Sequence, residues 1–131
     1  MSLIDNIKES EGFRSRVYKC TEGHNTIGYG FAIKDLHMDE DIAETILTRK
    51  LAELELRIEQ RFDFFEDLVE PVKDVIVEMC YQLGLSGFSK FKKTIKYFND
   101  HDFKNAAVEM LDSKWAKQTP NRAKKLSQIV K

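Results

Sequence analysis

Three side chains near the start of the chain have the types and spacing needed for acid–base chemistry. A carboxyl, a thiol and a hydroxyl group stand at Glu11, Cys20 and Thr26. A protonated carboxyl can donate a proton to a leaving oxygen, and a thiol beside a hydroxyl can hold and activate a water molecule. Taken singly, Cys20 is better explained as a small half-buried residue and Thr26 as an ordinary strand residue. The chemistry therefore depends on the elements that position the three.

Glu11 ends a helix predicted over residues 3–11. It follows Ile7 by four positions and shares an apolar face with Ile4 and Ile7. Gly12 is the residue type favoured just past a helix end. Partial burial and a place in the last helical turn both disfavour a charged carboxylate, so we expect Glu11 to remain protonated near neutral pH. A Glu that extends into solvent or pairs with a nearby arginine fits the position as well.

A β-hairpin is predicted directly after this helix. We expect its first strand, turn and returning strand over residues 16–20, 21–25 and 26–33. Cys20 ends the first strand and Thr26 opens the second, so their side chains should lie close together across the hairpin mouth. Gly28 and Gly30 leave one face of the returning strand bare, which is typical of close approach by a ligand or another backbone.

The remaining apolar pattern is helical. It predicts a long helix over roughly residues 39–61, a central buried helix from Pro71, and shorter helices of which the last begins at Thr119-Pro120. The fold class is α+β, with a small lobe over residues 12–38 joined by the long helix to a bundle over residues 63–131. Helix 3–11 is expected to join that bundle. The length suits a single domain over residues 1–131, with a cleft between unequal lobes for an extended ligand.

The composition excludes several classes of protein. No apolar run is long enough to cross a membrane, and the N-terminus is not a secretory signal, so we expect synthesis in the cytoplasm. Two cysteines without ligand-like spacing disfavour a disulfide framework or zinc site, and no cofactor or metal is expected. Residues 1–89 carry 10 basic and 18 acidic side chains, and residues 90–131 carry 11 and 4. The basic end could face an anionic polymer or be a solvated surface, and it shows no nucleic-acid motif.

The stretch EGFRSRVYKCTEGHNTIGYG resembles the phage-type lysozymes, or endolysins, of glycoside hydrolase family 24. That family carries a Glu, eight residues, an Asp or Cys, five residues and a Thr, which are the spacings of Glu11, Cys20 and Thr26. A second block, SKWAKQTPNRAK over residues 113–124, also matches. A third and weaker block is MCYQLGLSGFSKF over residues 79–91. The resemblance covers essentially the whole chain.

The resemblance implies a lysozyme-like fold and cleavage of the β-1,4 bond between N-acetylmuramic acid and N-acetylglucosamine in bacterial peptidoglycan. It makes Glu11 the general acid, and position 20 the group that directs water onto the opposite face of the sugar, with inversion. Thr26 would help to hold that water. The resemblance also assigns substrate contacts to Gly30, Tyr81 and Gln82, and a supporting place near the acid to Arg122.

The chain departs from the family pattern at several positions. Cys20 replaces the commoner Asp, and a thiol is the weaker base unless it is a thiolate, so we expect activity with a different pH profile. Phe31 stands where a His often follows the glycine, which removes any ion pair made there. Phe91 and Glu109 fall where the family has polar sugar-contacting residues. The short connection before the long helix predicts a trimmed β-lobe.

The resemblance implies peptidoglycan as the partner of a monomeric enzyme, with no nucleic acid and no stable membrane insertion. Such an enzyme would reach the wall through a separate holin-type pore. Two other functions remain open. One is a thiol enzyme that pairs Cys20 with His24 or His37, and the other is a non-catalytic wall-binding member of the fold.

Overall fold

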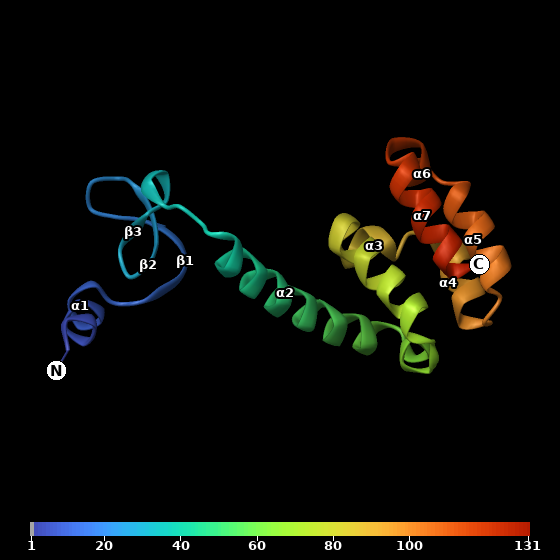
Figure 1. Cartoon of the computed structure of the whole chain (residues 1–131), viewed down its shortest axis with the longest axis horizontal. Helices are drawn as coiled ribbons and strands as arrows, with labels where there is room; N and C mark the ends of the chain where they lie inside the picture. Colours follow the sequence, from blue (N-terminus) through green and yellow to red (C-terminus); the bar gives the residue numbers. More distant parts are fainter. Residues whose placement is uncertain (1) are drawn as a thin grey trace. The chain divides into compact units, whose positions relative to one another are not determined.

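The computed structural model describes residues 2–131 and divides into two compact units, Met1–Ala43 and Glu44–Lys131. Figure 1 labels the elements of both units. The helices and the short antiparallel sheet of the protein form the α+β, lysozyme-like fold predicted from the sequence. The interpretation of the chain as a single domain stays a prediction.

The first unit begins with the predicted helix α1, Leu3–Glu11. The Ser2 hydroxyl accepts a hydrogen bond from the Asp5 backbone N–H, and the Asp5 carboxylate accepts one from the Ser2 backbone N–H. This reciprocal capping box satisfies backbone donors that a helix start leaves unpaired. Gly12 ends the helix with a φ of 71°, a conformation that glycine adopts without steric cost.

A three-stranded antiparallel sheet of order β1-β2-β3 follows α1. Its strands are β1 Arg14–Lys19, β2 Asn25–Gly28 and β3 Phe31–Ala32, followed by the 3-10 turn η1 Ile33–Asp35. The prediction of one returning strand over residues 26–33 is wrong. Gly28 and Gly30 have φ values of 70° and 79°, so the chain reverses there and β3 pairs back with β2. The small lobe is therefore a hairpin with a third short strand.

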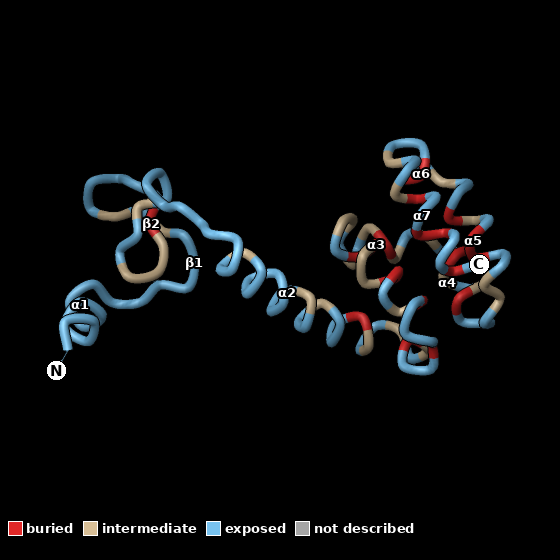
Figure 2. Tube along the Cα trace, viewed as in Figure 1, coloured by how far each residue is buried: buried red, intermediate tan, exposed pale blue. Residues whose placement is uncertain are grey.

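The first unit has almost no apolar core. Thr26 is its one buried residue among those that the structure describes, and Figure 2 shows most of this unit as exposed. Its large exposed apolar residues include Leu3, Ile4, Ile7, Phe13, Val17, Phe31, Ile33, Leu36, Met38 and Ile42. Caps, the strand ladder and aromatic contacts therefore hold this unit together locally.

The helix α2, Glu40–Arg61, coincides with the long helix predicted over residues 39–61. The 3-10 turn η2, Asp63–Asp67, and the helix α3, Glu70–Phe88, come next. As predicted, α3 carries a broad buried stripe that includes Val72, Val75, Ile76, Met79 and Cys80. Gly84, with non-helical backbone angles of φ 78° and ψ 155°, divides α3 into two helical segments.

Four shorter helices complete the second unit: α4 Lys92–Asn99, α5 Phe103–Leu111, α6 Lys114–Gln118 and α7 Pro120–Val130. The helix α5 packs against α4 and α7, and both α3 and α6 also pack against α7. Figure 2 shows the buried segments concentrated in these helices and α3. The fully buried Phe88 ring lies 5.9 Å from the Phe62 ring and 6.2 Å from the Phe91 ring, between centroids. No helix of the described part of the chain is long and apolar enough to cross a membrane.

Candidate active site

Glu11 is the last residue of α1, and its side chain is exposed. The prediction that Ile4 and Ile7 bury it partly is wrong, because these side chains are themselves 66% and 47% exposed. The apolar face of α1 is present as the sequence predicts, but the described residues of the first unit place no apolar layer over it.

The carboxylate of Glu11 lies against the turn between β2 and β3. A Cβ atom at Gly30 would stand 2.6 Å from Oε2 of Glu11, so the carboxylate in this position requires the absence of a side chain there. The preceding residue, Tyr29, joins the same turn to the end of α1. Its ring centroid lies 5.7 Å from Nζ of Lys8 and 5.4 Å from the ring centroid of Phe13. The cation–π and aromatic contacts hold the helix end beside the turn.

Cys20 follows β1 directly and belongs to the turn that leads to β2. Its backbone N–H donates to the His24 carbonyl oxygen at 2.9 Å, and its carbonyl oxygen accepts from the Gly23 N–H at 2.8 Å. Hydrogen bonds from the backbone N–H groups of His24 and then Glu22 to the sulfur lower the pKa of the Cys20 thiol below its ordinary value of 9.0. Two amide donors directed at one sulfur favour a thiolate there.

The Thr26 hydroxyl adjoins the same sulfur. Thr26 is 4% exposed, and its Oγ1 donates to the His24 carbonyl oxygen at 2.9 Å. A hydrogen bond from this hydroxyl to the sulfur contributes to the lowered pKa of Cys20. Since the hydroxyl has one proton, it can accept from the neutral thiol while bonded to His24, or donate to the thiolate. The prediction that Cys20 and Thr26 lie close together is confirmed.

Neither nearby imidazole makes a contact with the Cys20 sulfur among the interactions of the described residues. Nε2 of His24 lies 3.8 Å from a carboxylate oxygen of Glu22, and Nε2 of His37 lies 3.4 Å from one of Asp39. The groups that do contact the sulfur are backbone amides and a hydroxyl. This arrangement lacks the sulfur–imidazole pair of a thiol enzyme.

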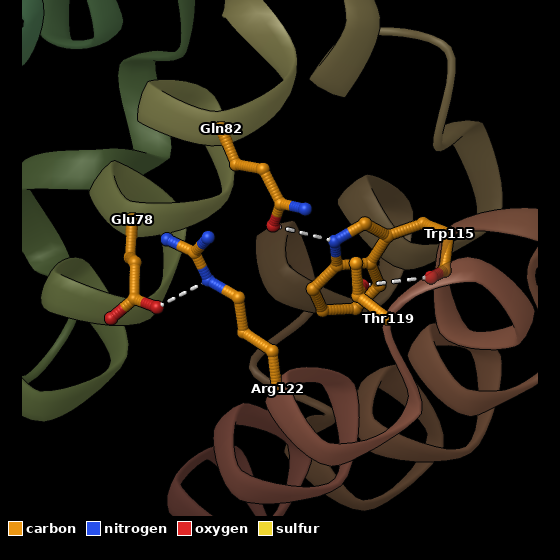
Figure 3. Close-up of polar contacts among 5 residues, drawn as sticks. All are labelled: Glu78, Gln82, Trp115, Thr119 and Arg122. Atoms are coloured by element: carbon orange, nitrogen blue, oxygen red, sulfur yellow. Dashed lines mark hydrogen bonds and ion pairs between the residues drawn. The ribbon is translucent and has the colours of Figure 1, made fainter.

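The remaining predicted residues lie in the second unit, where Figure 3 shows two polar contacts between α3 and the C-terminal helices. Oε1 of Gln82 accepts a hydrogen bond from the Trp115 indole N–H at 2.9 Å. Nε of Arg122 donates to Oε2 of Glu78 at 2.8 Å, and both side chains are partly exposed. Tyr81 precedes Gln82 and is half-exposed.

Sequence reasoning missed Glu78 and the Gln82–Trp115 hydrogen bond. Glu78 and Gln82 stand four positions apart on α3, which places them on one helix face. That spacing was the available signal for a polar face on α3, although it does not by itself name the partners. Arg122, expected near the catalytic acid by resemblance, has its ion pair within the second unit.

A hollow of about 560 Å³ lies in the second unit. Leu83, Phe91 and Trp115 give it an apolar lining, and the Phe91 and Trp115 rings meet edge to face at 6.1 Å. Glu109 lines the hollow as well. Phe91 and Glu109, which fall where the family has polar sugar-contacting residues, therefore share this hollow. Four lysines also line it: Lys90, Lys92, Lys93 and Lys114. Part of the basic end of the chain therefore surrounds an aromatic pair.

The helices and the small antiparallel sheet give the α+β arrangement of a lysozyme-like fold, and the family comparison identifies the chain as a glycoside hydrolase. The family model described as phage lysozyme matches residues 8–131. The chain belongs to the phage lysozyme family, whose lysozyme-type hydrolases have peptidoglycan as their substrate.

Relatives with lysozyme and endolysin names agree with this family. The probable T4-type lysozyme 2 of Dictyostelium discoideum is 29% identical over 157 aligned positions, which cover 98% of this chain and 92% of that protein. The endolysin of Bacillus phage B103 is 33% identical over 120 positions, covering 87% of this chain and 44% of that endolysin. The first alignment is longer than this chain, so the Dictyostelium protein has residues without a counterpart here.

Proposed function

We propose that this chain hydrolyses the β-1,4 bond between N-acetylmuramic acid and N-acetylglucosamine with inversion at the sugar. Glu11 donates its proton to the oxygen of the leaving sugar as the glycosidic C–O bond breaks. A water molecule forms the new C–O bond on the opposite face, and the Cys20 thiolate takes up its proton. Thr26 holds the water, in the arrangement expected of an acid and a base on opposite faces.

The observation that carries this proposal is the set of donors around the Cys20 sulfur. At its ordinary pKa of 9.0, a thiol would be only about 1% ionised at pH 7 and a poor base. The backbone N–H groups of His24 and Glu22 and the Thr26 hydroxyl lower that pKa, so a larger thiolate fraction is available near neutral pH. This environment supports a base at a position where most relatives of this kind are expected to carry a carboxylate.

We also propose that Tyr81 and Gln82 contact the substrate, with Arg122 in support, and that Gly30 contributes to the site beside Glu11. Tyr81 offers a half-exposed aromatic face, and the Trp115 indole fixes the orientation of the Gln82 amide. The proposal further includes a monomeric enzyme without nucleic-acid partner or stable membrane insertion, which reaches the wall through a separate holin-type pore.

The test compares Glu11→Gln with wild type on purified peptidoglycan, with release of reducing ends as the readout. Glu9→Gln is the matched control, since Glu9 is exposed on the same helix. Removal of a general acid typically costs about 10² to 10⁴ in rate, so Glu11→Gln should lose that much while Glu9→Gln stays active. The anomer formed first, followed by NMR, checks inversion.

Two outcomes would overturn the proposal in favour of its alternatives. If alkylation of Cys20 abolishes activity while Glu11→Gln remains fully active, the chain is a thiol enzyme. If wild type binds peptidoglycan but releases no reducing ends over the accessible pH range, the chain is a non-catalytic wall-binding member of the family.

A further inference from the structure

Gly30 has two separate reasons to be a glycine. Its φ of 79° lies in the left-handed region, which side chains disfavour. In addition, a Cβ atom there would stand 2.6 Å from Oε2, 3.1 Å from Cδ and 3.7 Å from Cγ of Glu11. Carbon and oxygen atoms in van der Waals contact lie well beyond the first of these distances. The Glu11 carboxylate therefore occupies the space that a side chain at position 30 would need.

The close approach to the acid distinguishes Gly30 from the other glycines with positive φ. A Cβ atom at Gly12, Gly23 or Gly84 would meet nothing within 4 Å. A Cβ atom at Gly28 would meet the Phe31 ring instead. Backbone conformation alone thus accounts for three of these positions, whereas at Gly30 the absent side chain also determines where the carboxylate of Glu11 can lie.

The end of α1 is held beside this turn, so it does not readily move away from an added side chain. Tyr29, which adjoins Gly30, contacts Lys8 and Phe13 on either side of Glu11 in the sequence. The movable part is the exposed Glu11 side chain, whose carboxylate is its far end. An added methyl group at position 30 would therefore displace the carboxylate rather than the helix.

We infer that Gly30 is a positioning residue for Glu11, through the space that its missing side chain leaves for the carboxylate. Resemblance assigns Gly30 a contact with the sugar, whereas this role acts through the acid. A general acid must lie within hydrogen-bond reach of the leaving oxygen, and a misplacement of about 1 Å can cost about 10²-fold in rate. The inference rests on the proposed role of Glu11 as that acid.

The test compares Gly30→Ala with Gly84→Ala on purified peptidoglycan. Gly84 is the control because it also has a positive φ, of 78°, which side chains disfavour, while its Cβ would meet nothing within 4 Å. Gly30→Ala should lower kcat by about 10- to 100-fold with KM within about threefold of wild type. Gly84→Ala should retain the wild-type kcat per folded molecule, with folding followed by circular dichroism.

A second measurement separates positioning from sugar contact. In the Glu11→Gln background, Gly30→Ala should leave sedimentation with insoluble peptidoglycan unchanged, because the acid through which Gly30 acts is already absent. Weaker sedimentation of the double variant would overturn the inference and make Gly30 a substrate contact. The inference would also be overturned if Gly30→Ala and Gly84→Ala had the same kcat.

A third measurement does not depend on catalysis. The ¹³C chemical shift of the Glu11 side-chain carboxyl should change in Gly30→Ala, while that of Glu9 should not. If Glu11→Gln is fully active but this shift changes, the proposed function fails and the contact between Gly30 and Glu11 stands. If the shift does not change, the contact is absent and the inference fails by itself.

Discussion

Replacement of Cys20 by Asp should move the rising limb of the pH–rate profile to lower pH. The thiol has an ordinary pKa of 9.0, which the backbone N–H groups of His24 and Glu22 lower, and an aspartate has one of about 3.9. The ordinary values differ by about 5 units, which sets the scale of the expected shift. Its sign is fixed, because the base must be deprotonated to accept a proton from water.

The size of the activity loss at pH values below the rising limb follows from the ionisation equilibrium of the Cys20 thiol. The thiolate fraction falls about tenfold for each pH unit below the pKa of the thiol. On the acid side of its limb, wild type should therefore lose activity about tenfold per unit, in a range where the Cys20→Asp variant remains near its plateau. The assay is the release of reducing ends from purified peptidoglycan between pH 4 and pH 9 at constant ionic strength.

Alkylation with iodoacetamide tests whether the rising limb of the pH–rate profile is due to the Cys20 thiol. Cys80 is 1% exposed, and burial raises the pKa of its thiol to about 12, so iodoacetamide should modify Cys20 alone in the folded protein. Modified wild type and Cys80→Ala should both lose activity, and Cys20→Asp should resist the reagent. A pH profile that is the same in wild type and Cys20→Asp would refute the role of the thiolate as base and leave Cys20 as a water-positioning group.

Three further predictions concern the second unit. Burial raises the pKa of the Cys80 thiol from 9.0 to about 12 in the folded state, so the neutral thiol stabilises the fold fully below pH 9.0 and this contribution is lost as pH rises toward 12. Relative to Cys80→Ala, wild type should lose about 1.4 kcal/mol of unfolding free energy per pH unit in that range, as measured by urea denaturation. The Arg122–Glu78 pair, whose side chains are 38% and 43% exposed, should show a coupling energy of at most about 1 kcal/mol in a double-mutant cycle with Arg122→Gln and Glu78→Gln. Phe88→Ala should cost about 3–5 kcal/mol in unfolding free energy, while Val108→Ala, at an exposed position, should cost less than about 0.5 kcal/mol.

Each of these has an outcome that would contradict it. A parallel pH dependence of stability in wild type and Cys80→Ala would mean that the Cys80 thiol ionises alike in folded and unfolded chains. A coupling energy above about 3 kcal/mol would mean that the Arg122–Glu78 pair is desolvated, contrary to its exposure. Equal losses in Phe88→Ala and Val108→Ala would contradict the place of the Phe88 ring in the core.

Local features of the chain could be predicted from the sequence because they depend on neighbours a few residues apart. The apolar spacing and Gly12 predict the end of the first helix at Glu11, as observed. The five residues between Cys20 and Thr26 bring these side chains together because a short turn leaves little freedom. Two local errors concern the strands: β1 ends at Lys19, so Cys20 lies in the turn and not in the strand, and the returning strand is interrupted at Gly28 and Gly30. Glycine permits a positive φ without requiring it, so the sequence does not reveal the reversal.

Only the tertiary structure decided the environment of each reactive group. Glu11 is exposed although its helix face is apolar, since burial depends on what packs against that face. Cys20 and Cys80 are the same residue type, yet amide hydrogen bonds lower the pKa of one thiol and burial raises that of the other. The Gln82–Trp115 contact joins residues 33 positions apart, and no periodicity predicts such a pair. The sequence by itself determined which chemical groups stand at the site, while the folded backbone determined which donors meet the Cys20 sulfur and how much space the Glu11 carboxylate has, because both depend on the path of the chain in space.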